Sequence, residues 1–504
     1  MTTSEQDIYE SRFLNARVPR RLLVLNWILA LAYLFILAFV FPIGNMTLFV
    51  VLILTEIFHL FLAGGFWWTA WQMKRDIQLS KDQPAVDVAI TVCGEPADIV
   101  RQTVLAAKAM NYPNFHIYIL NDGYAAKKDN WQEIMQLAKS LGVNCITRKT
   151  PGGAKAGNIN NALKKMYSPF VAVFDADHVP RPEFLKRVMQ HFYSSEVAFI
   201  QTPQYYKNHD LNLVTQASWE QQTLFFGPVC RGKDCMNSAF LCGTNMVIRR
   251  EALLEAGGMA EDSIAEDFLT SMRIHQNGWQ SVYVPEILAD GLAPEDLHAY
   301  CLQQFRWARG SLEVLFWHNP LFARGLSWRQ KLQYLSSSGY WLNGIVVFLN
   351  AVFPFVFFFF GIAPFVASNL FLALIFLPYI FLTFYTLSVS TNFSLTAQAI
   401  AFSIGSFVLQ IRATIATVFG YGQKFSVTPK RGAKQAFTSL AAIHLVYIAI
   451  SIVGVVFSLW REGLNASVAS NISWTAWNGI VFAYFVTASQ PQENKIAELE
   501  PALN

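Results

Sequence analysis

Residues 171–178 read VAVFDADH, an apolar run that ends in an acidic pair and a histidine. The run Val171–Phe174 is typical of a strand buried inside a sheet. Asp175 and Asp177 stand two positions apart where that strand would end, so a carboxylate there would point out of the sheet and could hold a hard cation such as Mg²⁺. Turns after strands often contain the same Asp-x-Asp pattern, so a cation site and an ordinary turn both stay open.

The sequence on both sides of this stretch extends the pattern. Val86–Val92 and Ile117–Leu120 are also short and apolar, and charged, helix-like stretches separate them. This alternation predicts an α/β domain with a mainly parallel sheet between about Lys81 and Leu335. Open sheets of this kind bind ligands at the carboxyl ends of their strands. Four segments at predicted strand ends therefore hold candidate site residues: Cys93-Gly94-Glu95-Pro96, Asn121-Asp122-Gly123, Lys155-Ala156-Gly157-Asn158 and Asp175-Ala176-Asp177-His178.

The composition indicates that part of the protein's surface lies in lipid. Of the 504 residues 53% are hydrophobic and 14% are charged, whereas charged residues make up about 25% of a typical soluble domain. These shares exclude a disordered scaffold, a disulfide-rich mini-protein and an ordinary soluble enzyme of one domain. The net charge of +4 is too small for a nucleic-acid-binding surface. We therefore expect membrane lipids, and no nucleic acid, among the partners.

The apolar surplus falls in runs of about 20 residues, the length of a helix that crosses a hydrocarbon core of about 30 Å. One further run, Leu395–Phe419, contains a polar residue every three or four positions and is predicted to be an amphipathic helix along the interface. Six runs are predicted to span the membrane: Leu22–Ile43, Met46–Trp68, Trp341–Val366, Leu370–Ser390, Ala436–Trp460 and Ile472–Ala488.

The basic residues predict the orientation. With six spans, Arg20, Arg75 and Arg431 lie on one side, which the positive-inside rule assigns to the cytoplasm. We expect a multi-pass protein of the plasma (inner) membrane with the α/β domain and both termini in the cytoplasm. The predicted domains are an N-terminal arm with two spans (1–80), the α/β domain (81–335), four spans with an interfacial helix and a loop at 420–434 (336–489), and a short tail (490–504).

Read in chain order, the motifs resemble those of the processive family 2 glycosyltransferases, most closely bacterial cellulose synthase catalytic subunits. The resemblance implies a GT-A (Rossmann-like) α/β catalytic domain inserted in an α-helical transmembrane domain of about six spans with interfacial helices. Seven motifs carry it: Asp122-Gly123, Lys155-Ala156-Gly157-Asn158, Asp175-Ala176-Asp177-His178, Gln201-Thr202-Pro203, Glu266-Asp267, Gln303-x-x-Arg306-Trp307 and Phe425-Ser426-Val427-Thr428-Pro429-Lys430.

The resemblance implies a nucleotide-sugar site. Asp122 would contact the nucleotide and Lys155 its diphosphate. Asn121 stands where the family has an aspartate, and its amide could still bond a uracil or ribose edge.

The same resemblance assigns a metal ion to the acidic pair. Asp177, with Asp175 nearby, would hold Mg²⁺ or Mn²⁺ on the diphosphate. His178 would contact a phosphate or support the metal ligands, and a structural histidine remains the alternative.

On the acceptor side, Asp267 would be the general base, next to Glu266. Gln303 and Arg306 would hydrogen-bond the terminal sugar of the growing chain, and Trp307 would be the floor on which that sugar stacks.

A mobile lid completes the implied site. Phe425, Val427 and Thr428 would move over the bound nucleotide and exclude water.

These roles imply a function. A single base and no second carboxylate nucleophile imply one displacement with inversion, so UDP-glucose would yield a β-glucan, cellulose or cellulose-like, that the spans export. Because only a short tail follows the last span, we expect no β-barrel (PilZ) receptor domain and no control by cyclic di-GMP in this chain. Export subunits or a homo-oligomer are possible further partners.

Three alternatives stay open. The product could be a β-1,3- or mixed-linkage glucan. The enzyme could be non-processive and add one sugar to a lipid acceptor. The chain could also be a transporter or channel whose soluble domain only binds nucleotide.

Overall fold

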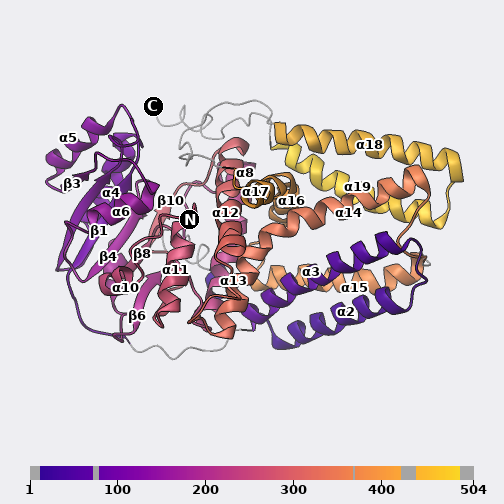
Figure 1. Cartoon of the computed structure of the whole chain (residues 1–504), viewed down its shortest axis with the longest axis horizontal. Helices are drawn as coiled ribbons and strands as arrows, with labels where there is room; N and C mark the ends of the chain where they lie inside the picture. The colour runs from indigo at the N-terminus through magenta and orange to yellow at the C-terminus, as the bar shows by residue number, and fades with distance from the viewer. Residues whose placement is uncertain (1–11, 72–78, 367–368, 422–438, 489–504) are drawn as a thin grey trace, which may run out of the picture.

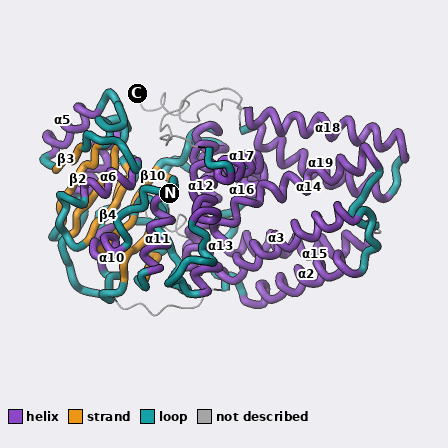
Figure 2. Tube along the Cα trace, in the orientation of Figure 1, coloured by secondary structure: helices purple, strands orange, loops and turns teal. Residues whose placement is uncertain are grey.

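The computed structural model describes residues 12–71, 79–366, 369–421 and 439–488. An α/β body forms one end of the molecule and long helices form the other (Figure 1). Strands lie only in the α/β body among the described residues, with helices packed around them (Figure 2).

The central sheet has seven strands in the order β3-β2-β1-β4-β8-β6-β9. Neighbouring strands are parallel except where β8 pairs antiparallel with β4 and β6. The predicted mainly parallel sheet is confirmed, and the predicted strands Val86–Val92, Ile117–Leu120 and Val171–Phe174 fall within β1, β2 and β4. The strands are β1 (Val86–Val92), β2 (Phe115–Asn121), β3 (Asn144–Thr147), β4 (Phe170–Asp175), β6 (Val197–Gln201), β8 (Met246–Arg249) and β9 (Gln280–Tyr283).

Helices cover both faces of this sheet, because each strand alternates its side chains between the faces. Val86, Val88 and Ile90 of β1 pack against α4, α5 and α7, and Ala89 joins the opposite cluster with α6, α10 and α11. These helices are α4 (Ala97–Lys108), α5 (Trp131–Leu141), α6 (Ala154–Ala162), α7 (Phe184–Met189), α10 (Arg250–Glu255) and α11 (Glu266–Gln276).

A second, three-stranded sheet lies beside the carboxyl end of β4. Its strands are β5 (Val179–Pro180), β10 (Ala289–Gly291) and β7 (Tyr205–Tyr206), in that order. Gly291 pairs with Tyr206 in register. Because β5 directly follows His178, this small sheet connects the turn after β4 to the residues that precede α12 (Leu297–Trp317).

A layer of helices joins the α/β body to the long helices. In Figure 1, α12 crosses between the two ends, with α8 and α13 beside it. A π-helix precedes α9, and a 3-10 turn connects α13 to α14. The bounds are α8 (Leu213–Leu224), the π-helix (Phe225–Val229), α9 (Cys230–Asp234), α13 (Trp328–Gly339) and the 3-10 turn (Tyr340–Leu342).

The long helices agree with the six predicted spans in place and approximate length. In Figure 1 they lie along one direction, with α18 and α19 beside α14, and with α2 and α3 beside α15. They are α2 (Arg20–Phe39), α3 (Met46–Ala70), α14 (Asn343–Phe360), α15 (Asn369–Ser390), α18 (Ser439–Glu462) and α19 (Ala466–Thr487).

Among the described residues, six helices are long and apolar enough to cross a membrane. They differ by one member from the six long helices named above. Ala397–Val418 qualifies, whereas α19 does not. Asn471, Thr475 and Asn478 lower the hydropathy of α19, although its 22 residues give about 33 Å of helix, enough to cross. Ala397–Val418 is two helices, α16 (Ala397–Gly405) and α17 (Phe407–Val418), that meet at Ser406.

The predicted interfacial stretch Leu395–Phe419 forms two helices that pack largely against the rest of the protein. Its window Ala397–Val418 is 61% buried inside the protein. Its polar side chains bond protein groups: Ser403 accepts from Gln221 at 3.1 Å, and Gln398 donates to the Leu213 carbonyl at 3.0 Å. Two of the polar residues in this stretch, Gln398 and Ser403, therefore bond helix α8.

Candidate active site

Two aspartates and a histidine meet where β4 ends. Ligand atoms of Asp175, Asp177 and His178 all lie within 4.8 Å of one another. Asp177 is 4% exposed and His178 5% exposed. Both ring nitrogens of His178 are buried without a hydrogen-bond partner, although Nδ1 lies 3.5 Å from Oδ1 of Asp177. Since an unsatisfied buried polar group costs about 1–3 kcal/mol, this ligand set fits a divalent cation, which would be held by one ring nitrogen and the carboxylates.

A glycine fixes the place of the His178 ring. A Cβ atom built on Gly291, in β10, would lie 2.5 Å from Nε2 of His178. Contacts that short do not occur between non-bonded carbon and nitrogen atoms, so any larger residue at 291 would displace the imidazole. The small sheet therefore determines where the third candidate ligand stands.

Lys155 is the cation of this sheet edge. It is the second residue of α6, and its Nζ donates to Oδ1 of Asp175 and, at 2.6 Å, to the Gly243 carbonyl. Burial opposes the charge of Lys155, but the carboxylates of Asp175, Glu266 and Asp267 outweigh it and raise its pKa. Burial likewise opposes ionisation of Asp175, and Lys155 and His178 reverse that effect and lower its pKa. The ammonium is therefore charged and close to where the predicted diphosphate would lie.

The predicted nucleotide residues follow β2. Asp122 is buried, and its two carboxylate oxygens accept from Nε and Nη2 of Arg148 at 2.6 and 2.8 Å. Arg148 also donates to the Gly152 and Ala154 carbonyls, so it ties Asp122 to the start of α6. Arg148 was not predicted as a site residue, because a single arginine after a short strand carries no motif.

Asn121 lies in a different environment from the one its predicted role requires. Its side chain is fully buried, donates to the Trp131 carbonyl at 2.8 Å and accepts from the Gly123 amide at 3.0 Å. Both ends of the amide therefore shape the turn that presents Asp122.

Glu95 adds a further carboxylate to this edge. Its Oε2 accepts from the Cys93 amide at 2.5 Å. Burial, followed by the charges of Asp175 and Asp177, raises the pKa of Glu95. Several carboxylates that repel one another at one edge are expected where a protein binds a cation.

Asp267 and Glu266 occupy the first turn of α11. Oδ1 of Asp267 accepts from the Phe268 amide at 2.7 Å. Burial, and then the neighbouring Glu266 charge, raises the pKa of Asp267 to about 7. A Cβ on Gly243 would be 3.2 Å from Oδ2 of Asp267 and 3.5 Å from Nζ of Lys155, so both groups border the same glycine. A carboxylate suited to accept a proton thus stands beside the predicted diphosphate lysine.

The predicted acceptor residues lie on α12. Gln303 is buried, and Arg306 and Trp307 are partly buried. Tyr206, which was not predicted, is close enough to both the acceptor residues and the cation site for their groups to affect its pKa. Burial and then Asp177 raise the pKa of Tyr206, whereas Gln303 and Arg306 lower it. A tyrosine five residues after Gln201 carries no recognisable sequence signal, and only the fold brings it between β4 and α12.

A buried ion pair attaches α12 to the loop before the base. Nε of Arg309 lies 3.1 Å from Oε1 of Glu313, and both side chains are almost fully buried. Oε2 of Glu313 accepts from Ser263 at 3.1 Å and from the Ile264 amide at 2.9 Å. Arg309 also donates to the carbonyl of Tyr421.

The structure therefore brings most predicted site residues to one place. The cation ligands, Asp122, Lys155 and the Glu266–Asp267 pair border the carboxyl ends of β1, β2 and β4 or the loop before β8. The three predicted lid residues, Phe425, Val427 and Thr428, lie outside the described residues.

Comparison with known proteins adds to this geometry. Residues 84–310 match the family described as "Glycosyltransferase like family 2", and residues 255–396 match the family described as "Cellulose synthase". The chain is 34% identical over 441 residues to the cellulose synthase catalytic subunit [UDP-forming] of Pseudomonas fluorescens (strain SBW25). The matched region covers 83% of this chain and 58% of that protein. The corresponding subunit of Xanthomonas axonopodis pv. citri (strain 306) is 37% identical over 292 residues, 56% of this chain and 39% of that protein. The chain thus spans less than two thirds of the length of these curated relatives.

A solved structure shares the fold. A mannosyltransferase from Pyrobaculum calidifontis, in complex with GDP-Man and Mn²⁺, superposes with a TM-score of 0.54 at 14% identity, over 74% of this chain and all of that chain. This likeness supports the GT-A fold.

Gly291→Ala should disturb the cation site without unfolding the protein. The added methyl group displaces the His178 ring, and removal of such a support typically weakens metal binding by about tenfold or more. Titration of the purified protein with Mn²⁺, followed by electron paramagnetic resonance, measures the change.

Gly479→Ala is the matched control, because nothing lies within 4 Å of a Cβ at Gly479. Unchanged Mn²⁺ affinity in Gly291→Ala would contradict the assignment of His178 as a ligand.

Arg309→Met should destabilise the protein by about 3–5 kcal/mol, because it leaves Glu313 buried without a charge partner. The thermal unfolding midpoint in detergent reports the loss. Adding Glu313→Gln should restore part of it, since no uncompensated charge then remains.

Arg273→Met supplies the comparison, because Arg273 pairs with Asp262 at the surface and such pairs contribute roughly 0–1 kcal/mol. If Arg309→Met and Arg273→Met lowered the unfolding midpoint equally, the buried ion pair would stabilise the protein no more than the surface pair does.

Proposed function

Because the chain belongs, through residues 84–310, to the family 2 glycosyltransferases and is related to bacterial cellulose synthase catalytic subunits, we propose that it transfers glucose from UDP-glucose to the end of a growing β-glucan. One observation carries this proposal. The candidate cation site, the partly buried Lys155 and the Asp267 carboxylate lie at one edge of the sheet, where a nucleotide sugar and an acceptor can meet.

The donor side needs charge neutralisation. Asp175, Asp177 and His178 would hold Mg²⁺ or Mn²⁺, which supplies Lewis-acid stabilisation of the departing diphosphate. Lys155 adds a second positive charge from the other side of Asp175. Asp122, oriented by Arg148, would bind the nucleoside, and the buried Asn121 would position Asp122 through the turn.

Asp267 would perform the proton transfer. Its carboxylate accepts the proton of the acceptor hydroxyl, the hydroxyl oxygen bonds to C1 of glucose, and the C1–O bond to UDP breaks with inversion. Burial and Glu266 raise the pKa of Asp267, which makes it a stronger base than an exposed aspartate. UDP leaves with the electron pair of the broken bond.

Helix α12 would bind the acceptor. Trp307 would stack against the terminal sugar, and Gln303 and Arg306 would hydrogen-bond around it. Tyr206, between the cation ligands and α12, would keep the donor site and the acceptor site in a fixed relative position. Phe425, Val427 and Thr428 would close over the bound nucleotide.

Six candidate spans and the relationship to cellulose synthases indicate a multi-pass membrane protein. We place the catalytic domain and both termini in the cytoplasm, on the evidence of the basic residues. An export path for the glucan would run between the long helices, where a hydroxylated chain needs polar partners. Thr55 and Asn350 meet there at 3.4 Å across α3 and α14, and Tyr447 accepts from Asn478 at 3.4 Å across α18 and α19. The glucan could be β-1,4-linked, as in cellulose, or have β-1,3 or mixed linkages.

Asp267→Asn should abolish sugar transfer almost completely, because the acceptor hydroxyl loses its base. Radiolabelled product from UDP-glucose, Mg²⁺ and the purified full chain gives the rate. Asp262→Asn is the control, since this half-exposed aspartate pairs with Arg273 at the surface. Activity retained in Asp267→Asn would support the transporter alternative.

The same base predicts the pH dependence. Asp267 acts only when ionised, and its raised pKa of about 7 means that the wild-type rate should fall as the pH drops from 8 to 6. A rate that stays constant down to pH 5 would exclude a base with a raised pKa.

Product analysis separates the processive and non-processive functions. Wild-type protein should make a polymer that cellulase, β-1,3-glucanase or lichenase digests, and the enzyme that succeeds identifies the linkage. Trp307→Ala should stop elongation, because the terminal sugar loses its stacking surface, while UDP binding persists. A single glucolipid product would instead establish the non-processive alternative.

A further inference from the structure

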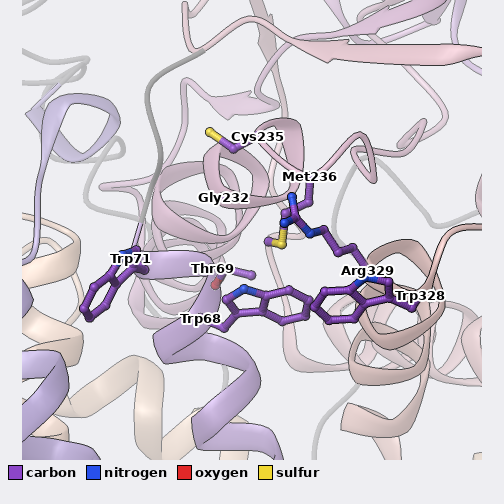
Figure 3. Close-up of a pocket in the computed structure, with 8 residues that line it drawn as sticks. All are labelled: Trp68, Thr69, Trp71, Gly232, Cys235, Met236, Trp328 and Arg329. Carbon is purple, nitrogen blue, oxygen red and sulfur yellow. The ribbon is translucent and has the colours of Figure 1, made fainter.

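A pocket of about 430 Å³ lies where the end of α3 meets α9 and α13 (Figure 3). Three tryptophans from two helices contribute to its lining: Trp68 and Trp71 at the end of α3, and Trp328 at the start of α13. None of these residues has a role in the proposed transfer reaction.

The pocket lies beside the ends of two helical segments that are long and apolar enough to cross a membrane. Helix α3 is a candidate span that ends at Ala70, and the candidate span Trp328–Phe360 begins at the pocket. Both of these ends face the α/β body in Figure 1. Trp328 is 62% exposed and Trp71 37% exposed, and tryptophan is enriched at the level of lipid headgroups.

The walls are flat and apolar. The rings of Trp68 and Trp328 stack with centroids 5.5 Å apart and an angle of 4° between their planes. Met236 contributes a flexible thioether to the same pocket, and Arg329 extends toward it in Figure 3. Such a surface favours a hydrocarbon chain over a polar ligand.

Two arginines give the pocket a positive rim. The guanidinium of Arg329 lies 5.5 Å from the Trp328 ring centroid, and that of Arg20 lies 5.1 Å from the Trp71 ring centroid. Neither arginine forms an ion pair within the described part of the chain. Arginines next to an apolar cavity, without a carboxylate partner among the described residues, complement a ligand that has an anionic head and an apolar tail.

We propose that this pocket binds one anionic membrane phospholipid. Its phosphate contacts Arg329, with Arg20 adding positive charge, and the first part of an acyl chain lies against Trp68, Trp328 and Met236.

The pocket wall is connected to the catalytic domain. A Cβ on Gly232, in α9, would lie 2.1 Å from the Thr69 carbonyl, so the backbones of α9 and α3 are in direct contact. The buried Lys233 donates to the backbone and side-chain oxygens of Gln333 in α13 at 3.0 and 2.9 Å. Asp234 accepts from the Tyr283 amide of β9 at 2.9 Å.

From this wall the chain leads directly to the active-site loop. Seven residues after Met236, Gly243 presents the carbonyl that binds Lys155. A bound lipid would therefore hold in place the segment that borders both the pocket and the site. This effect on turnover rests on the proposed function, whereas lipid binding does not.

Native mass spectrometry of the full chain in detergent tests the binding. With phosphatidylglycerol and phosphatidylcholine supplied in equal amounts, wild-type protein should retain phosphatidylglycerol preferentially. Arg329→Gln and Trp328→Ala should each weaken this binding by about tenfold, the effect expected from loss of one charge-assisted contact or one stacked ring.

Two controls keep the outcome clear. Arg21→Gln removes the same charge one residue from Arg20 on the same exposed helix end, outside the pocket. Trp460→Ala removes an indole that is 80% exposed at the far end of α18. Both should bind phosphatidylglycerol as wild type does.

Equal retention of the two lipids, or equal losses in Arg329→Gln and Arg21→Gln, would overturn the proposal. Because Arg329 is exposed, its substitution tests the site even if Trp328→Ala fails to fold. Phosphatidylglycerol should also raise glucose transfer in nanodiscs of wild type and not of Arg329→Gln. A chain that binds the lipid and transfers no glucose would contradict the proposed function and leave this site standing.

Discussion

The contact of Lys155 with Asp175 and the Gly243 carbonyl is the interaction on which the site depends. Five carboxylates, those of Glu95, Asp175, Asp177, Glu266 and Asp267, gather around one sheet edge, and their mutual repulsion would otherwise drive them apart or keep them protonated. The partly buried ammonium of Lys155 joins α6, β4 and the loop before β8, so it both neutralises charge and fixes the geometry. A divalent cation at Asp175, Asp177 and His178 would complete the neutralisation. The acidic cluster is therefore stable only in a protein that also binds positive charge.

Close backbone contacts transmit this geometry to the rest of the molecule. A Cβ at Gly310 of α12 would lie 2.4 Å from the Cβ of Ala265, the residue before the base-bearing helix. The glycines at 291 and 232 make equally close contacts, with His178 and with Thr69. Each of these sites lets two elements approach without an intervening side chain. The acceptor helix, the cation ligands and the membrane helices thus have little freedom to move separately.

Much of the architecture could be predicted from periodicity and length. Strands β1, β2 and β4 and the long helices follow from short apolar runs and runs of about 20 residues, because burial within a sheet or in lipid requires those patterns. Within Ala397–Val418, the contacts of Gln398 and Ser403 with α8 could not be predicted, because a sequence does not distinguish a polar residue that binds protein from one that binds water. Arg148, Tyr206 and the Arg309–Glu313 pair were not predicted, because most of their partners lie far away in the chain: Asp122 is 26 positions from Arg148, and Tyr421 is 112 positions from Arg309.

Reading along the chain was enough to identify the candidate chemical groups: two aspartates and a histidine at a strand end, a glutamate–aspartate pair, a Gln-x-x-Arg-Trp motif and apolar runs of membrane length. These are local, since each depends on residues a few positions apart. Which of these groups face one another depends on how the chain folds. The tertiary structure turned Asn121 inward, paired Asp122 with Arg148, and brought Asp267 and Lys155 to either side of Gly243. Those contacts depend on strand order and helix packing. Burial of apolar surface brings the distant segments together, and an apolar residue does not indicate in the sequence which other segment it will pack against.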